Sequence, residues 1–150
     1  MELIKSKENI LRSFTLIHRR TWNYLDWKYR EFGISGPQHI YITAVCRDPG
    51  LIQNSLCDPL GVDKSNVARN VKELVKKGFI ERHRGKDNQK NWCLYPTDKA
   101  LEIYNNLIVI YIDLMEKILQ GLSHEDRELF EDILQLIEIN SRTLLNDEKI

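Results

Sequence analysis

Two helical segments joined by a three-residue turn, and followed by a short hairpin, constrain the fold of this chain most strongly. The first helix is expected over about residues 53–60, where Gly61 can end it. Asp63 can cap a second helix over residues 64–77, which Gly78 can end. Two helices joined by such a glycine-containing turn form a helix-turn-helix.

The residues after Gly78 indicate a β-hairpin. Residues 79–83 and 91–95 are β-prone runs, and the segment between them, RGKDNQK, is too polar to be buried. The hairpin is therefore expected to carry a charged loop at the surface, immediately after the second helix.

The helix over residues 64–77 is predicted to be amphipathic. Its apolar side chains fall on one side at helical spacing: Val67, Val71, Leu74 and Val75. The remaining arc carries polar and cationic side chains: Ser65, Asn66, Arg69, Asn70, Lys72 and Lys76. The apolar side is expected to pack inward and to leave the polar arc exposed.

Long helical patterns precede this region. Apolar residues recur at helical spacing over about residues 6–32, and Gly33 follows them where it can end a helix. Ser35 and Gln38 have the spacing of a capping box. They predict a second helix that Ser35 caps and that runs to about Arg47.

The C-terminal third is predicted to form two more helices. Thr97 can cap a helix that runs to about Gln120, and Gly121 breaks it. Ser123 and Asp126 mark the start of the last helix. Both helices carry broad apolar stripes, so each needs a surface to pack against.

Charge is distributed unevenly along a chain whose formal net charge is zero. Residues 63–90 carry nine Lys/Arg against four Asp/Glu, a net charge of +5. Residues 98–150 carry five against twelve, a net charge of −7. The middle of the chain therefore attracts a polyanion, whereas the C-terminal third repels one.

The composition predicts one soluble globular domain: 150 residues, 42% hydrophobic and 29% charged. No apolar stretch is long enough to cross a bilayer, and the first residues lack the apolar core of a signal peptide. We therefore expect a cytoplasmic protein that has no membrane partner. Cys46, Cys57 and Cys93 suit neither a disulfide framework nor a zinc ligand pair, so we expect reduced thiols, with redox sensing as the alternative.

The basic segment has the residue types that a DNA-binding helix needs. A DNA major groove admits an α-helix and presents donors and acceptors that Asn and Arg can match. The helix residues expected to contact DNA are Lys64, Ser65, Asn66, Arg69 and Asn70. The loop residues expected to contact phosphates or the minor groove are Arg84, Lys86 and Lys90. A solvated helix face is the alternative, but the turn, the glycine stop and the basic hairpin together favour nucleic acid.

The segment LGVDKSNVARNVKELVKKGFIER, with the basic loop after it, resembles the multiple antibiotic resistance regulator (MarR) family of winged-helix transcription factors. The flanking helices agree with that family's topology, so the resemblance covers nearly the whole chain. It implies that Ser65, Asn66 and Arg69 contact bases or nearby phosphates, and that the hairpin is the wing. Many members carry Asp-x-Arg in the wing, whereas this chain has Gln89 where the arginine stands.

The expected fold class is mainly α, of the α+β kind: a winged helix-turn-helix with long N- and C-terminal dimerisation helices. We expect a single MarR-like domain over residues 1–150, with the winged helix-turn-helix at 35–97 and the dimerisation helices at 1–34 and 98–150. The terminal helices carry more apolar residues than one chain covers, which predicts a two-fold homodimer. Its recognition helices would lie roughly 34 Å apart, one turn of DNA, so the operator should be near-palindromic.

The resemblance also implies a small-molecule effector, bound between the dimerisation helices and the DNA-binding part. Amphipathic side chains that suit such a pocket lie in the relevant segments: His18, Trp22, Trp27, His39 and Tyr41. Core packing is the alternative interpretation of each. We therefore expect a ligand-responsive repressor that binds double-stranded DNA as a dimer, with an aromatic or phenolic acid as the first effector to test, and with no cofactor and no metal.

An enzyme and a winged helix that binds protein are the two alternatives to a DNA-binding regulator. An enzyme is disfavoured because the chain has no Gly-x-Ser-x-Gly elbow, no phosphate-binding glycine loop and no His-Glu-x-x-His. A winged helix that binds protein instead of DNA would keep the fold, but it would not need a segment with a net charge of +5. Salt-dependent binding to duplex DNA separates these classes.

Overall fold

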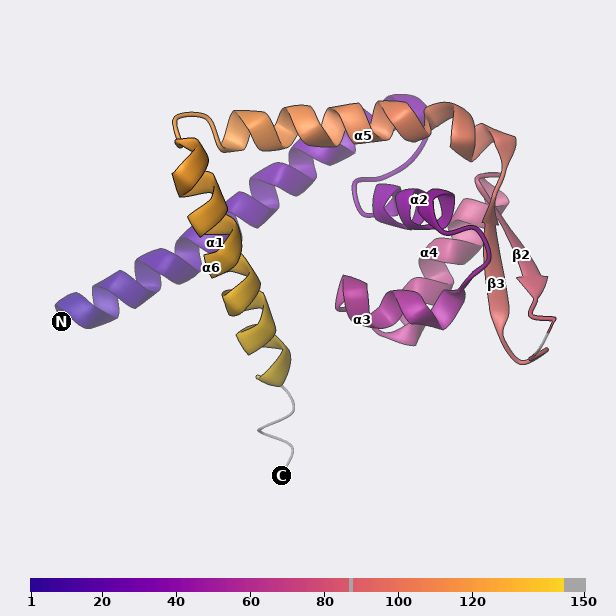
Figure 1. Ribbon diagram of the computed structural model, residues 1–150, viewed down its shortest axis with the longest axis horizontal. Helices are drawn as coiled ribbons and strands as arrows, with labels where there is room; N and C mark the ends of the chain where they lie inside the picture. Colours follow the sequence, from indigo (N-terminus) through magenta and orange to yellow (C-terminus); the bar gives the residue numbers. More distant parts are fainter. Residues whose placement is uncertain (87, 145–150) are drawn as a thin grey trace. The chain divides into compact units, whose positions relative to one another are not determined.

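The computed structural model describes residues 1–86 and 88–144, and the chain divides into two compact units, Met1–Ile112 and Asp113–Ile150. The boundary falls within helix α5 (Asp98–Ile118). The first unit contains α1 to α4, the sheet and the start of α5 (Figure 1). The predicted mainly helical chain, with long first and last helices, a helix-turn-helix and a small sheet, is confirmed.

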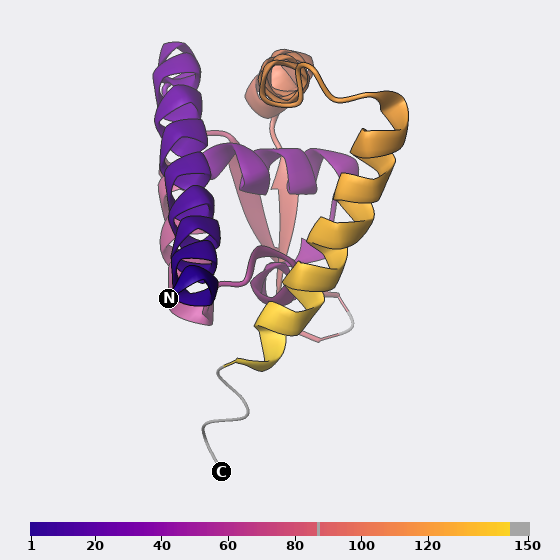
Figure 2. The ribbon, with the colours of Figure 1, turned by 90° about the vertical axis from the view of Figure 1, so that its left-hand side faces the viewer.

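α1 spans Glu2–Tyr29 and continues into a 3₁₀ turn at Arg30–Phe32 (Figure 2). Gly33 ends it in the left-handed conformation, with φ of 73°, as the sequence predicts. Near its end, Leu25 and Tyr29 are buried. Near its start, the helix exposes a series of large apolar side chains: Leu3, Ile4, Ile10, Leu11, Phe14 and Ile17. One chain therefore buries only the last part of the apolar face of α1.

The second helix begins later than the capping-box pattern predicts. α2 spans Gln38–Arg47, and Pro37 occupies its N-cap position without a side-chain cap. Only one of the two capping-box bonds forms: the Ser35 backbone N–H donates to Gln38 Oε1 at 3.2 Å, but no side chain caps the start of the helix. The Ser35 cap is therefore wrong. Gly36 and Pro37 form a turn that separates Ser35 from the helix.

The helix-turn-helix forms as predicted, although its first helix is short. Residues Gln53–Leu56 form a 3₁₀ turn, and α3 spans only Cys57–Leu60. Gly61 follows in the left-handed conformation, with φ of 60°. α4 spans Lys64–Lys76, and the Asp63 carboxylate accepts from a backbone N–H of its first turn at 2.7 Å.

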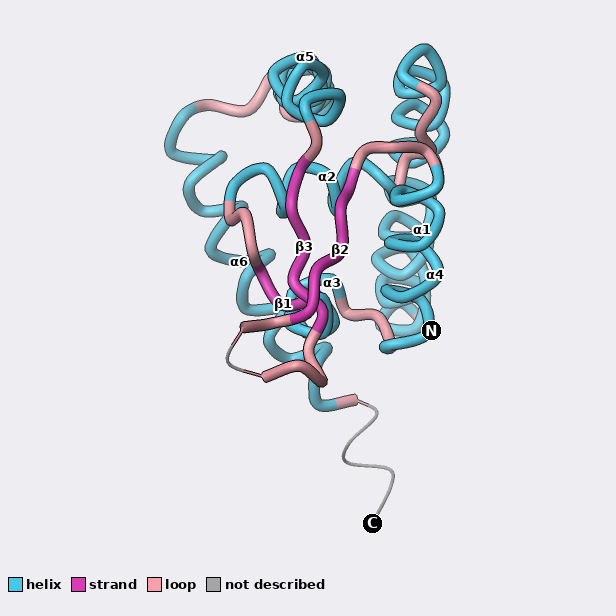
Figure 3. The backbone as a smooth tube through the Cα atoms, turned by 90° about the vertical axis from the view of Figure 1, so that its right-hand side faces the viewer, coloured by secondary structure: helices cyan, strands magenta, loops and turns pink. Residues whose placement is uncertain are grey.

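Three strands, β1 (Leu51–Ile52), β2 (Ile80–Arg84) and β3 (Trp92–Pro96), form an antiparallel sheet in the order β1-β3-β2 (Figure 3). The two hairpin strands each begin one residue later than predicted. Their register places Arg84 opposite Trp92. β1 was not predicted, because two residues are too few to show a periodic pattern, and the strand exists only through its pairing with β3.

The core of the first unit includes side chains from α2, α4 and the sheet, and Figure 1 shows both helices on the same side of the β2–β3 hairpin. Its most deeply buried large side chains are Tyr29, Phe79, Ile42, Leu74, Ile80, Leu94, Leu107, Val45, Val67 and Val71. The predicted inner face of α4 is confirmed at three of its four apolar positions. Val75 is the exception, with 38% of its surface exposed. The next residue along a helix is turned by about 100°, so Leu74 and Val75 cannot share one narrow face.

The segment before α5 begins that helix as predicted. Thr97 Oγ1 accepts a hydrogen bond from the Ala100 backbone N–H at 3.3 Å. The helix ends at Ile118, slightly before the predicted end near Gln120. Gly121 then adopts a positive φ of 91°, which explains why a glycine stands at the break.

The second unit contains the end of α5 and helix α6 (His124–Thr143). The predicted capping box between Ser123 and Asp126 is present. α6 exposes many large apolar side chains: Leu129, Phe130, Ile133, Leu134, Leu136, Ile137 and Ile139. Within the part of the chain that the structure describes, no helix has the length and hydropathy needed to span a membrane.

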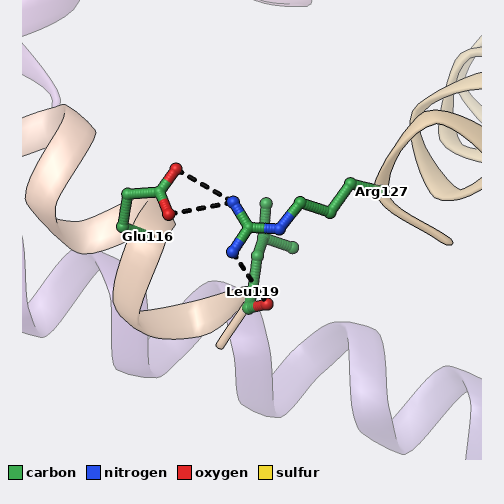
Figure 4. Close-up of polar contacts among 3 residues, drawn as sticks. All are labelled: Glu116, Leu119 and Arg127. Carbon is green, nitrogen blue, oxygen red and sulfur yellow. Dashed lines mark hydrogen bonds and ion pairs between the residues drawn. The ribbon is translucent and has the colours of Figure 1, made fainter. Parts of the chain in front are cut away.

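Hydrogen bonds from one arginine link the two helices on either side of the turn between α5 and α6. The Arg127 guanidinium donates to the two Glu116 carboxylate oxygens at 3.0 and 2.9 Å, and to the Leu119 carbonyl at 3.4 Å (Figure 4). Arg127, in the first turns of α6, thus forms hydrogen bonds to the end of α5 and to the residue that follows it. Two charge-assisted bonds and one carbonyl bond restrict the angle of this turn within the unit.

Candidate nucleic-acid interface

α4 presents the predicted polar arc to solvent. Lys64, Ser65 and Arg69 are exposed, and Asn66 and Asn70 are half-buried beside them. The apolar residues between these positions face the core. All five residues that the sequence assigns to DNA contacts on this helix are therefore accessible from outside the unit.

A buried amide fixes the C-terminal half of α4 to α2. Gln38 is only 2% exposed, and its amide nitrogen donates to Glu73 Oε2 at 2.8 Å. Its amide oxygen accepts from Lys77 Nζ at 2.8 Å. Because both ends of the amide are paired, Gln38 can be buried without leaving an unsatisfied polar group. Sequence reasoning missed this role, since one glutamine at the start of a helix carries no signal for it.

Residues at the start of α5 cap the end of α4. Thr97 Oγ1 donates to the Gly78 carbonyl at 2.7 Å. Lys99 Nζ donates to the Lys77 carbonyl at 2.8 Å and lies 4.2 Å from the centre of the Phe79 ring. A cation is favourable at this end of a helix because the exposed carbonyl groups carry partial negative charge. The start of α5 is thus bonded directly to the two residues that follow α4, Lys77 and Gly78.

The hairpin exposes the three cations that the sequence predicts, Arg84, Lys86 and Lys90. The Arg84 guanidinium donates to the Gln89 carbonyl at 3.1 Å, across the loop. Gln89, which replaces the arginine common in the MarR family, is also exposed. Asp87 of the same motif lies outside the described residues.

Two guanidinium groups pack against one indole on the hairpin. Arg82 lies 4.1 Å and Arg84 lies 3.8 Å from the centre of the Trp92 ring, both at favourable cation–π distances. Burial lowers the pKa of Arg82, and the charge of Arg84 lowers that pKa further. Arg82 and Trp92 were missed from the sequence. The alternation of side chains along a strand was the available signal, because it places Arg82 and Arg84 on one face.

Three of the five residues predicted to bind an effector come together in the first unit. Trp22 Nε1 donates to His18 Nδ1 at 2.7 Å, and the Trp22 and His39 ring centres lie 6.1 Å apart. An open hollow of about 530 Å³ beside α1 is lined by Thr15, His18, Arg19, Trp22, Asn23 and Pro37. The other two residues lie apart from this cluster. Trp27 is 61% exposed, and Tyr41 is buried with its hydroxyl against α4.

The imidazole of His39 is buried, with 7% of the residue exposed. Its ring centre lies 4.8 Å from the ring centre of Tyr29 and 6.3 Å from that of Tyr111. Its Nδ1 faces the Gly36 carbonyl at hydrogen-bonding range. Burial lowers the pKa of His39, and this hydrogen bond opposes the shift only in part. Burial also raises the pKa of Tyr29, to about 12, while its hydroxyl donates to the Leu107 carbonyl at 3.2 Å. Both rings are therefore expected to be neutral at pH 7.

The folded protein is expected to lose stability as the pH falls from about 7 to 5, in part through His39. The unfolded chain protonates this histidine near its ordinary pKa of about 6.5, whereas the folded protein does so at lower pH. The unfolded state thus binds more protons in this range, which lowers the free energy of unfolding. Urea unfolding at both pH values should show a smaller loss for His39→Gln than for the wild type. His124→Gln, which changes an exposed side chain on α6, should behave like the wild type, and identical losses in all three proteins would contradict this assignment.

The three cysteines are free thiols with partly exposed side chains. Burial raises the pKa of the Cys46 thiol, so less of it is thiolate at neutral pH. Over residues 1–86 and 88–144, no three His, Cys, Asp or Glu side chains group closely enough to hold a metal ion.

Comparison with known proteins identifies relatives for both the central segment and the longer chain. The sequence profile of the MarR family matches residues 32–89. The chain is 27% identical over 132 residues to the HTH-type transcriptional regulator YybA of Bacillus subtilis, with 88% of each chain covered. The crystal structure of a MarR family transcriptional regulator from Listeria monocytogenes, complexed with a 26mer DNA, has a TM-score of 0.83 at 28% identity and covers 87% of both chains. The crystal structure of the transcriptional regulator SlyA has a TM-score of 0.84 at 29% identity, covering 88% of this chain and 93% of that one.

These matches agree with the geometry described above. The profile match includes α2, α3, α4 and β2, which carry most of the candidate interface. The two solved relatives extend the likeness to at least 87% of this chain. The chain is therefore similar to MarR family transcriptional regulators in sequence over residues 32–89, and to the two solved regulators in fold over at least 87% of its length.

Proposed function

We propose that this protein is a dimeric transcriptional regulator that binds a specific double-stranded DNA site through α4 and the β2–β3 hairpin. The observation that carries the proposal is the joint exposure of Lys64, Ser65 and Arg69 on α4 and of the cations on the hairpin that follows it. The segment with a net charge of +5 thus presents its positive charge on two adjacent surface elements of one unit.

The two elements suit different parts of a duplex. An α-helix fits the major groove with its N-terminal residues nearest the bases, and in α4 these are residues 64–70. The hairpin cations suit phosphates or the minor groove, where they add affinity with little sequence preference. The relative from Listeria monocytogenes was solved with a 26mer DNA, which supports the same class of partner for this chain.

The proposed dimer rests on apolar surface that one chain leaves exposed. α1 and α6 expose the rows of large apolar side chains described above, and α5 exposes Leu101, Val109, Tyr111, Ile112 and Ile118. Contiguous exposed apolar surface often marks a protein–protein contact. A second copy of the chain would cover them in a two-fold assembly, and a near-palindromic operator follows from that symmetry.

We propose that a small aromatic acid regulates DNA binding from the hollow beside α1. The Trp22 indole and the His18 imidazole offer aromatic surface there, and the Arg19 guanidinium is available for a carboxylate. A regulator of this kind represses transcription by occupying promoter DNA, and it releases the DNA when the ligand favours another arrangement of the dimer.

Binding to duplex DNA is expected to weaken steeply as salt rises, because each phosphate contact releases counterions. Lys86→Ala and Lys90→Ala should each weaken binding to different duplexes by a similar factor and reduce the slope of log K against log salt by about 1. Fluorescence anisotropy with a duplex selected from random sequence, and with an unrelated duplex of equal length, measures both effects. Lys5→Ala, which removes an exposed lysine from the start of α1, should change neither the affinity nor the slope.

The result of the same titration decides between the two classes of partner. If the wild-type protein binds no duplex even at low salt, the DNA-binding proposal is wrong and a winged helix that binds protein is preferred. If it binds but the Lys86 and Lys90 variants keep the full salt slope, the hairpin makes no phosphate contacts.

A further inference from the structure

The orientation of one amide on α4 determines which base edge it can bind. Asn66 is half-buried in the first turn of α4. An asparagine amide offers an acceptor oxygen and a donor NH₂ group, and it binds adenine by using both. The hydrogen bonds that Asn66 makes inside the protein therefore limit the bonds that it can make to DNA.

Asn70 fixes the direction of the Asn66 amide. Asn70 Nδ2 donates to the Asn66 backbone carbonyl at 3.0 Å. Because a carbonyl only accepts, the NH₂ group of Asn70, and not its oxygen, must point there. The same nitrogen lies 2.9 Å from Asn66 Oδ1, so Asn66 turns its own oxygen toward Asn70.

Tyr41 on α2 provides a second donor to the same oxygen. Its hydroxyl donates to Asn66 Oδ1 at 3.3 Å, and the tyrosine is only 3% exposed. Burial raises the pKa of Tyr41, so the hydroxyl keeps its proton at neutral pH and remains a donor. Asn66 Oδ1 thus accepts from two protein groups, Tyr41 and Asn70.

The amide nitrogen of Asn66 remains open to an outside acceptor. Within residues 1–86 and 88–144, no group accepts a hydrogen bond from Asn66 Nδ2, and this atom is not among the buried polar atoms that lack a partner. An amide held in this way offers DNA two N–H donors and no acceptor.

We propose that Asn66 reads DNA only as a hydrogen-bond donor, with Tyr41 and Asn70 as the residues that set its orientation. It should favour guanine, whose O6 and N7 are two neighbouring acceptors on one base edge. Adenine should be disfavoured relative to guanine, because only its N7 accepts and its exocyclic amino group is a donor; cytosine should be rejected, because its amino group is a donor. This inference rests on the proposed DNA-binding function and specifies what one of its residues reads.

The contact position is found by selecting sites from random duplex DNA with the wild-type protein and with Asn66→Ala. The base pair whose preference disappears in the variant is the one that Asn66 reads. At that position, the wild-type protein should bind guanine about fivefold or more tightly than adenine, the lower end of the discrimination for a good base contact.

Tyr41→Phe tests the orientation, because it keeps the ring and removes one donor to Asn66 Oδ1. The freed amide can turn and bond both N7 and the amino group of adenine, so the preference for guanine over adenine should fall several-fold. Asn70→Ala removes the other donor from the surface of α4 and should act in the same direction if Tyr41→Phe lowers stability. Tyr104→Phe is the matched control, because it removes a tyrosine hydroxyl that accepts from Arg47 Nε at 3.3 Å and does not bond Asn66. It should leave the preference unchanged.

Three results would overturn the inference and leave the proposed function intact. They are equal or tighter binding to adenine by the wild-type protein, a preference unchanged in both Tyr41→Phe and Asn70→Ala, or no base position lost in Asn66→Ala. A wild-type protein that selects no duplex at all would instead overturn the proposed function.

Discussion

Leu74→Ala is expected to lower the free energy of unfolding by roughly 2–5 kcal/mol, the range for large cavities in well-packed cores. Leu74 is fully buried on the inner face of α4, in the core that also includes Phe79 and Ile80. The substitution removes buried apolar surface and leaves a cavity that the surrounding helices and sheet fill only in part. Urea unfolding at a fixed protein concentration, followed by circular dichroism, measures the loss.

Val75→Ala is the matched control for this prediction. Val75 is the next residue on the same helix, but 38% of its surface is exposed, so its truncation should cost only about 0.5 kcal/mol. Equal losses in the two variants would mean that Leu74 does not face the core. The pair therefore tests the rotation of α4 about its own axis, which also decides which side chains point toward DNA.

Arg69→Ala is expected to reduce affinity for a selected operator by roughly 1–3 kcal/mol, if the guanidinium makes a good base contact. Arg69 is exposed on the outer arc of α4, so the substitution should leave both the fold and the proposed dimer intact. Anisotropy titrations of selected and unrelated duplexes give the affinities, and sedimentation confirms the assembly state. The loss should be larger for the selected duplex, because a base contact adds specificity that a phosphate contact does not.

Arg69→Lys separates the charge of this residue from its geometry. Lysine keeps the positive charge but lacks the planar fork that binds two acceptors of one base. We expect Arg69→Lys to recover binding to unrelated duplexes while it stays weak on the operator. Unchanged operator affinity in Arg69→Ala would remove this residue from the interface.

The elements that short local signals specify were predicted well from the sequence. Asp63 and Gly78 bound α4, and the Ser123–Asp126 capping box begins α6, because each signal depends only on hydrogen bonds within one turn. The same type of pattern failed at Ser35. There, Pro37 and the turn before it set the start of α2, so a complete capping box does not form.

The parts that depend on distant residues were not predictable in the same way. β1 has only two residues and exists by pairing with β3, far along the chain. The roles of Gln38 and Tyr41 depend on α2 packing beside α4, which no local pattern reports. The surface positions of the residues predicted to contact DNA could be predicted from the sequence, because the exposure of a residue on one helix follows from the helical period and from its charge. The groups that hold them in place become visible only in three dimensions.

The bonds from Thr97 and Lys99 to the carbonyls of Gly78 and Lys77, the two residues that follow α4, have a mechanical consequence. Because these bonds join the first turn of α5 to the residues at the end of α4, a displacement of the start of α5 is expected to move α4 with it. In the proposed function, a molecule that tilts the start of α5 would therefore shift α4 relative to the DNA, and a few ångströms of misplacement are enough to break hydrogen bonds to base edges.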